Sequence, residues 1–196
     1  MFAAVVITVG VVSNKDVKLV ENTKGSVNSV SEAALSIVNP KIRYVASYVK
    51  LDYPGGDVPA NTGVCSDVVI RTYRELGIDL QKEVHEDMLQ NFHLYPNKWG
   101  LTKPDPNIDH RRVPNLMVYF SRFGKELPIT KNPQDYSPGD IIVWDLSGRG
   151  TTHIGIITDV VGKSGAYAIV HNIGRGQELQ DCFYMYSGRI IGHYSY

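Results

Sequence analysis

Two residue types in this chain could carry out acyl-transfer chemistry: a cysteine thiol and a histidine imidazole. Cys65 is followed by apolar residues at helical spacing (Val68, Val69 and Tyr73), so we expect it in the first turn of a buried helix. The N-terminus of a helix stabilises a thiolate through its unpaired N–H groups and its dipole. His153 begins an apolar run after a Gly-rich turn and is therefore expected at the start of a strand. There it could take the thiol proton and deliver it to a leaving amine.

Other interpretations of the same residues are open. A single cysteine in a helix is often a small buried hydrophobe, and a histidine at a strand start is often structural. The chain has two cysteines, so Cys65 and Cys182 could form a disulfide in an exported protein, and Cys182 otherwise fits a buried strand position. Cys65, His153 and His171 could also ligate zinc, although the sequence has no closely spaced ligand pair.

The composition limits the class of protein. Of the 196 residues, 43% are hydrophobic and 20% are charged, which is typical of a globular domain. Lys plus Arg and Asp plus Glu both number 20, and no basic stripe with interleaved aromatics is present, so we expect no nucleic-acid partner. No motif indicates a metal or another cofactor.

The N-terminal segment differs from the remainder of the chain. Residues 1–13 (MFAAVVITVGVVS) form a small apolar run, and residues 14–28 are polar. The run is similar to the core of a secretory signal but lacks basic residues in front of it, and a first strand is the alternative. It is too short to span a bilayer. We therefore predict a signal-like or linker segment over 1–28, one domain over 29–196, and export to the periplasm or cell envelope.

The elements that would position these residues follow a simple order. Ser29 and Glu32 form a capping-box pattern before a short helix. A second helix begins near Cys65, and a later helix has Pro114 near its first turn. The predicted helices cover 30–38, 65–76, 80–92 and a segment after 113; the predicted strands cover 140–144, 153–161, 166–170 and 189–196. This order indicates an α+β fold with N-terminal helices packed on a C-terminal antiparallel sheet.

Several blocks occur in a specific order along the chain. Tyr53-Pro54-Gly55-Gly56 precedes Val64-Cys65-Ser66-Asp67, Pro138-Gly139-Asp140 leads into an apolar strand, and His153-Ile154-Gly155-Ile156 precedes Val170-His171. From Tyr53 to the C-terminus, the chain resembles the NlpC-type family of bacterial cell-wall peptidases in the papain-like superfamily. The resemblance is strongest to an uncharacterised branch known as a domain of unknown function. It implies a papain-like fold.

The resemblance also implies a role for each matching position. Cys65 would be the nucleophile, His153 its base, and His171 the residue that orients His153. Asn172 is the alternative third member, because its amide oxygen could accept the imidazole N–H; it could instead cap the turn that follows. Tyr53 would lie near the developing oxyanion, or else be a core aromatic.

The sequence departs from the family pattern beside the nucleophile. The family's Asp before Cys, which helps to bind a free amine, is Val64, and the Gly after Ser is Asp67. Asp67 could still recognise an amine or could be solvated. The segment 107–112 (NIDHRR) could form a carboxylate-binding rim, or its arginines could simply be solvated.

The resemblance implies an amide-bond or peptide-bond hydrolase that acts through a thioester. Its substrate would be a peptide of bacterial peptidoglycan, and no cofactor is implied. The competing hypothesis is a non-catalytic module of the same fold that binds a wall peptide without cutting it.

Overall fold

The C-terminal half of the chain forms one antiparallel sheet. The computed structural model describes residues 27–186 and 189–196. Within them the six strands lie in the order β3-β8-β4-β5-β6-β7. Their bounds are Lys125–Glu126 (β3), Ile141–Asp145 (β4), Thr152–Val161 (β5), Tyr167–His171 (β6), Glu178–Gln180 (β7) and Ile190–Ser195 (β8). The hydrogen-bonded neighbours β4 and β5 form the centre of the sheet.

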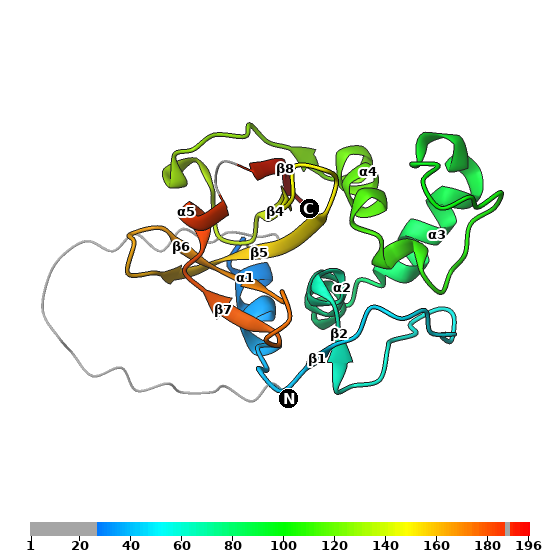
Figure 1. Cartoon of the computed structure of the whole chain (residues 1–196), viewed down its shortest axis with the longest axis horizontal. Helices are drawn as coiled ribbons and strands as arrows, with labels where there is room; N and C mark the ends of the chain where they lie inside the picture. Colours follow the sequence, from blue (N-terminus) through cyan, green and yellow to red (C-terminus); the bar gives the residue numbers. More distant parts are fainter. Residues whose placement is uncertain (1–26, 187–188) are drawn as a thin grey trace, which may run out of the picture.

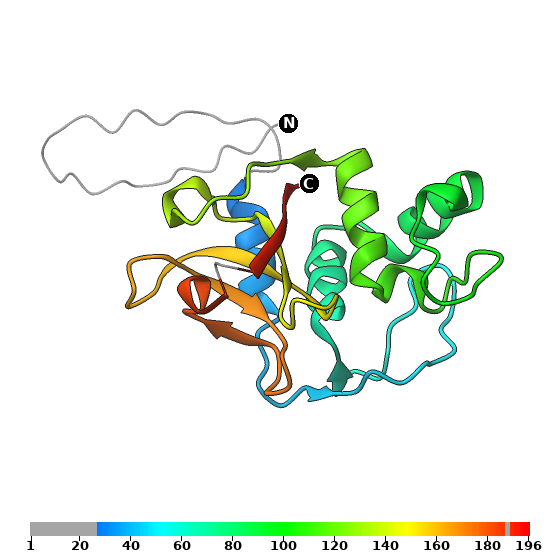
Figure 2. The ribbon, with the colours of Figure 1, turned by 45° about the horizontal axis from the view of Figure 1, so that its top comes forward.

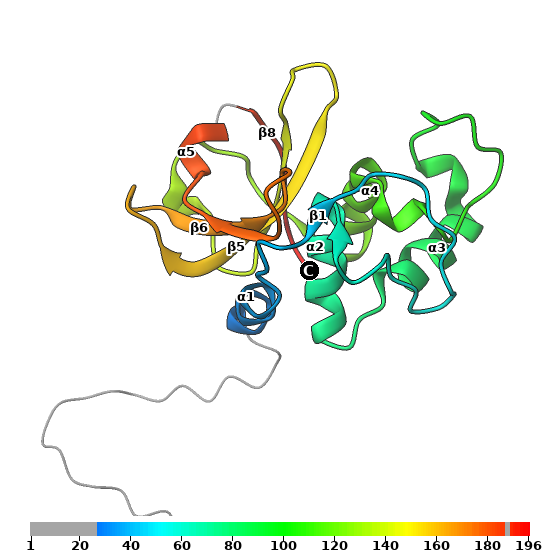
Figure 3. The ribbon, with the colours of Figure 1, turned by 60° about the horizontal axis from the view of Figure 1, so that its bottom comes forward.

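The helices of the N-terminal half cover this sheet. They are α1 (Val27–Ser36), α2 (Cys65–Glu75), α3 (Leu80–Asn91) and α4 (Val113–Phe123), with a short α5 (Phe183–Tyr186) near the C-terminus. Helices α1, α2 and α4 contact β5, whereas α3 packs on α2 and α4. In Figure 1 the helices α2 to α4 lie together beside the sheet. Figures 2 and 3 show this group of helices and the sheet from other sides.

Long connections contain short elements of their own. A parallel pair, β1 (Arg43–Tyr44) and β2 (Thr62–Gly63), lies directly before α2. Three 3₁₀ turns occur at η1 (Phe92–Leu94), η2 (Asp109–Arg111) and η3 (Pro133–Asp135). The parallel pair fixes the chain that enters α2, and η2 fixes the chain that enters α4.

Side chains of the central strands point alternately to the two faces of the sheet and form a hydrophobic core on each face. Residues such as Val143, Ile154 and Ile156 face the helices and pack with α2 and α4. Residues such as Trp144 and Ile157 face the other way. Because successive side chains of a strand point to opposite faces, each strand buries both of its faces. Each fully buried aliphatic side chain contributes about 1.5–3 kcal/mol of hydrophobic free energy.

The structure confirms the α+β layout and the helices and strands that the sequence predicted. The short strands β1, β2, β3 and β7 were not predicted, because two or three residues cannot show a periodic pattern. The predicted signal-like or linker segment lies, over residues 1–26, outside the described residues. Among the described residues, no helix is long and apolar enough to cross a membrane.

Candidate active site

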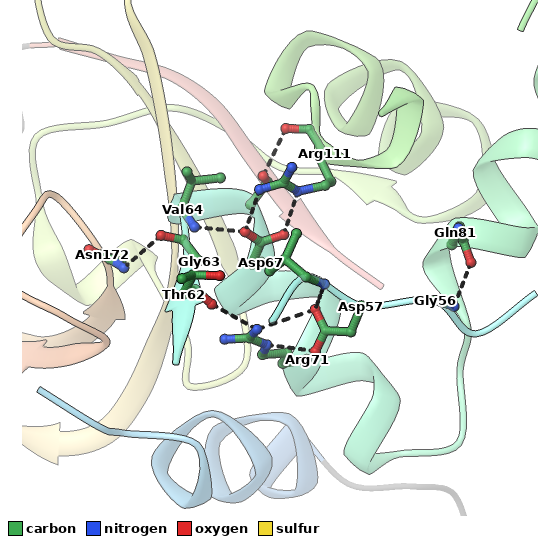
Figure 4. Close-up of polar contacts among 12 residues, drawn as sticks. Gly56, Asp57, Thr62, Gly63, Val64, Asp67, Arg71, Gln81, Arg111 and Asn172 are labelled. Atoms are coloured by element: carbon green, nitrogen blue, oxygen red, sulfur yellow. Dashed lines mark hydrogen bonds and ion pairs between the residues drawn. The ribbon is translucent and has the colours of Figure 1, made fainter. Parts of the chain in front are cut away.

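The local structure before α2 places Cys65 at the first position of that helix. Val64 is extended (φ −121°, ψ −174°), and its N–H donates to Asp67 Oδ2 at 2.7 Å, which closes the first turn. The preceding residues are held as well. Asn172 Nδ2 donates to the Gly63 carbonyl at 3.3 Å, as Figure 4 shows. The buried Cys65 thiol is therefore carried on a backbone that is fixed from several sides.

His153 lies at the second position of β5, where the strand passes the start of α2. Its ring stacks on Trp144 of β4 with centroids 5.4 Å apart and planes 27° apart. The N–H of the next residue, Ile154, is directed at the Cys65 thiol. The structure thus brings the strand that carries the candidate base against the helix that carries the candidate nucleophile.

His171 is the hydrogen-bonding partner of His153. The Nε2 atom of His153 lies 2.8 Å from Nδ1 of His171 on the neighbouring strand β6. The close approach of β5 and β6 requires a glycine, because a Cβ at Gly155 would lie 3.0 Å from the Val170 carbonyl oxygen and 3.1 Å from His171 Cβ. This gives a packing reason for the His-x-Gly spacing in the sequence.

A third residue, Gln180, sets the positions of the protons in this pair. Its Oε1 lies 2.9 Å from His171 Nε2. A carbonyl oxygen only accepts, so Nε2 of His171 carries the hydrogen and, in the neutral ring, Nδ1 accepts one. His153 Nε2–H must then be the donor, which leaves a lone pair on His153 Nδ1. The chain of hydrogen bonds therefore selects the tautomer in which His153 can act as a base.

Burial governs the ionisation of these groups. Burial, and secondarily the neighbouring His171, lowers the pKa of His153 to about 3. Burial also lowers the pKa of His171 and raises the pKa of the Cys65 thiol, although the Ile154 N–H opposes the latter shift. At neutral pH the site therefore holds a neutral thiol and neutral imidazoles. The thiolate expected at a helix N-terminus is not favoured here, because loss of solvation outweighs the helix dipole.

The resting thiol contacts groups other than His153. Its neighbours include the N–H groups of Ser66 and Ile154 and the side chain of Tyr44. Among the described residues, no hydrogen bond joins Cys65 to His153. Proton transfer between them therefore requires a closer approach of the two groups, and catalytic hydrogen bonds often tighten only when a substrate is bound.

Asn172, the alternative partner of His153, makes different contacts. Its Oδ1 accepts the N–H of Gly174 at 3.0 Å, and its Nδ2 donates to Gly63. Asn172 therefore caps the turn after β6 and ties that turn to the segment before α2. The structure brings His171, and not Asn172, to the imidazole of His153.

The tyrosine beside the thiol is Tyr44, and the structure places Tyr53 elsewhere. Tyr53 is 42% exposed, and the edge of its ring contacts His85 at a centroid distance of 5.1 Å. It is thus neither a core aromatic nor a neighbour of Cys65. Tyr44 lines the pocket next to Cys65. Burial, and to a lesser extent the neighbouring Cys65 thiol, raises the pKa of Tyr44 to about 12. No spacing in the sequence indicated Tyr44, because it belongs to a two-residue strand outside every recognised block.

Asp67 is occupied by an internal ion pair, which corrects both interpretations of this residue. Arg111 donates from Nε to Oδ1 at 2.8 Å and from Nη2 to Oδ2 at 2.9 Å, as Figure 4 shows. Both side chains are 2% exposed. Asp67 is therefore neither solvated nor free to bind an amine. Arg111 is likewise not solvated; it joins η2 to the first turn of α2.

The remaining alternatives concern the second cysteine and metal binding. Cys65 and Cys182 are both free and buried, and no disulfide joins them. The Cys182 sulfur lies 3.8 Å from His171 Nε2, so it packs behind the histidine pair. Within residues 27–186 and 189–196, no group of three or more His, Cys, Asp or Glu side chains has the arrangement that a metal ion needs.

The fold and site define an α+β protein with a candidate cysteine–histidine centre between a helix and a sheet. Residues 31–196 match the family described as "Domain of unknown function (DUF1287)", and the chain belongs to this family. The family is one of unknown function, as expected, and its relation to NlpC-type peptidases stays a prediction. The chain is 49% identical over 168 residues to "Uncharacterized protein YijF" of Escherichia coli (strain K12). The aligned region covers 86% of this chain and 80% of YijF.

A solved structure is also similar in part. It is NlpC2 from Trichomonas vaginalis, with a TM-score of 0.42 and 17% sequence identity. The match covers 91% of this chain and 49% of that chain, so the present chain spans about half the length of the NlpC2 chain.

Proposed function

We propose that this protein is a papain-like cysteine hydrolase of the NlpC type that cuts an amide or peptide bond in peptides of bacterial peptidoglycan. The observation that carries the proposal is the hydrogen-bonded chain from Gln180 through His171 to His153, beside a cysteine at a helix N-terminus. Such a chain orients a base in the way that triads do. Export to the cell envelope is part of the proposal, because the substrate is found there.

The proposed reaction proceeds in two halves. The Cys65 thiol gives its proton to His153 Nδ1 as its sulfur attacks the amide carbonyl, and the oxyanion develops near backbone N–H groups and the Tyr44 hydroxyl. His153 then protonates the leaving nitrogen, the C–N bond breaks, and a thioester forms on Cys65. Water attacks the thioester, gives a proton to His153, and releases the carboxylic acid; the proton returns to the thiol.

The experiment is a digestion of purified peptidoglycan and its soluble fragments, analysed by mass spectrometry. Wild-type protein should release a product with a newly freed amine and carboxylic acid, and Cys65→Ala should release none. Cys182→Ala is the matched control, because it removes the other buried thiol, and it should remain active. Equal amounts of cleavage product from the wild type and from Cys65→Ala would contradict the proposal.

A non-catalytic wall-peptide module is the second candidate. Two observations favour it: the absence, among the described residues, of a hydrogen bond from Cys65 to His153, and the raised pKa of the thiol. On this hypothesis Cys65→Ser retains binding of soluble wall peptides, and the wild type leaves those peptides uncut. Isothermal titration alongside the digestion separates the two candidates.

A further inference from the structure

A pocket of about 240 Å³ opens beside the candidate nucleophile. Cys65 and Ser66 line it from the start of α2, and Thr152 lines it from the start of β5. Trp99 and Arg112 line it from the segment between α3 and α4. A group bound in this pocket would therefore contact both elements of the candidate centre.

The charged side chains that line the pocket are cations. They are Arg111 and Arg112, and no carboxylate lies among the described lining residues. The matching anions lie behind them: Asp67 holds Arg111 through two hydrogen bonds, and Asp109 Oδ1 lies 3.3 Å from Arg112 Nη1. The pocket therefore faces the positive end of each ion pair.

The Arg112 side chain is more exposed than that of Arg111 (17% against 2%) and has more hydrogen-bond donors to spare. Asp109 is its only side-chain hydrogen-bond partner among the described residues, and a guanidinium has five N–H donors. The Arg112 guanidinium lies 4.1 Å over the Trp99 ring centroid. Stacking of this kind orients the plane of the guanidinium. An oriented guanidinium matches the two oxygens of a carboxylate.

The pocket is poorly suited to a free amine. Val64, which lines the pocket, is apolar, and the carboxylate of Asp67 is taken by Arg111. An ammonium group in the pocket would meet the like charge of Arg112 without a facing anion. The local charge thus opposes an amine and favours an acid.

We propose that the pocket beside Cys65 binds a carboxylate group of the substrate through Arg112, with Trp99 as the platform that orients it. The inference rests on the proposed function, because it treats this pocket as the place where substrate lies. It predicts that the preferred substrates carry a free carboxylate close to the amide that is cut.

The test uses two thiol reagents of nearly the same shape and different charge, iodoacetate and iodoacetamide. Their rates of reaction at Cys65 are measured by peptide mass spectrometry at about pH 9.5, near the titration range of a thiol. The iodoacetate-to-iodoacetamide ratio should be about tenfold higher in the folded protein than in the unfolded protein, because one unit charge acts at close range. Arg112→Gln should bring this ratio to within about twofold of the unfolded value.

Two further variants support the comparison. Lys163→Gln removes the same charge from an exposed turn after β5 and should leave the ratio unchanged. Arg112→Lys keeps the charge but loses the planar fork that Trp99 orients, so it should keep only part of the preference. A folded ratio equal to the unfolded ratio, an unchanged ratio in Arg112→Gln, or no reaction of folded Cys65 with either reagent would each overturn the inference.

The outcome is independent of turnover, because alkylation needs no substrate hydrolysis. Charge preference at Cys65 in a protein that cuts no wall peptide would support this inference and contradict the proposed function alone. Hydrolysis of wall peptides without any charge preference would contradict this inference alone.

Discussion

The Oε1 atom of Gln180 lies 2.9 Å from Nε2 of His171 and thereby determines which nitrogen of His153 is free to accept a proton. Gln180 belongs to β7, a three-residue edge strand, and touches neither Cys65 nor the pocket beside it. It acts through His171 and is therefore a positioning residue. The hydrogen-bonded chain ends at this amide, which accepts without taking up a proton.

Replacement of Gln180 should reduce turnover without loss of the fold. Gln180→Leu removes the acceptor, so His171 can adopt the other tautomer and His153 loses its fixed orientation. We expect kcat to fall about 10- to 100-fold with little change in KM, as for residues that orient a functional histidine. Gln90→Leu, on the exposed face of α3, is the control. An unchanged kcat in Gln180→Leu would show that the hydrogen bond from His171 to Gln180 has no role in orienting His153.

Gln180→Glu gives a second measurement at the same position. A carboxylate in place of the amide favours protonated imidazole, so the pKa of His171 should rise. The acidic limb of the pH–rate profile should therefore move to higher pH than in the wild type. A purely structural role of Gln180 predicts no such displacement.

Cys65 should react slowly with alkylating reagents at neutral pH in the protein without substrate. Burial raises the thiol pKa, so the thiolate fraction grows only above the ordinary cysteine range of about 8.5. The rate of iodoacetamide labelling against pH, mapped to Cys65, checks this, with the unfolded protein as reference. A plateau reached below pH 7 would mean that the thiol is ionised by His153 before substrate binds.

The ion pair between Asp67 and Arg111 should be essential for stability. Asp67→Ala leaves the Arg111 guanidinium buried without its partner, which costs about 3–5 kcal/mol in the free energy of unfolding. Urea denaturation measures this change. Glu86→Ala, which breaks the exposed pair with Lys82, is the control and should change stability by less than about 0.5 kcal/mol. Equal effects of the two substitutions would contradict the buried ion pair.

Acid should destabilise the protein partly through His110. This side chain is 2% exposed, and burial lowers its pKa to about 3. The unfolded chain binds a proton at His110 below about pH 6.5 and the folded chain does not, so stability falls as pH decreases from about 6.5 toward 3. His110→Phe should lessen the drop in Tm between pH 7 and pH 4.5 relative to wild type. His93→Phe, at an exposed position, should leave that drop in Tm unchanged.

The sequence was sufficient to predict the long elements and several members of the candidate site. Cys65 and His153 stand at element boundaries that periodicity and turn residues mark clearly, and β6 ends at His171, one residue beyond the end that its apolar run predicts. Gln180 and Tyr44 were not predicted, because they lie on strands of two or three residues that carry no pattern.

The electrostatics of the site were the least predictable part. A helix N-terminus and an acidic residue in its first turn suggested an ionised thiol and a solvated or ligand-binding Asp67. Instead, tertiary packing buries the thiol and joins Asp67 to Arg111, 44 residues further along the chain. Burial and long-range pairing depend on the complete fold, so a local pattern cannot reveal them.

In the proposed reaction, Cys65 forms a thioester with the acyl part of its substrate. The most direct measurement is the mass of the Cys65 peptide after wild-type protein is mixed with soluble peptidoglycan fragments and quenched in acid within a turnover. We expect a mass increase equal to the acyl half of the cut fragment, abolished by hydroxylamine and missing from Cys65→Ala. Cleavage of the fragments without any adduct, and at full rate in Cys65→Ala, would contradict it.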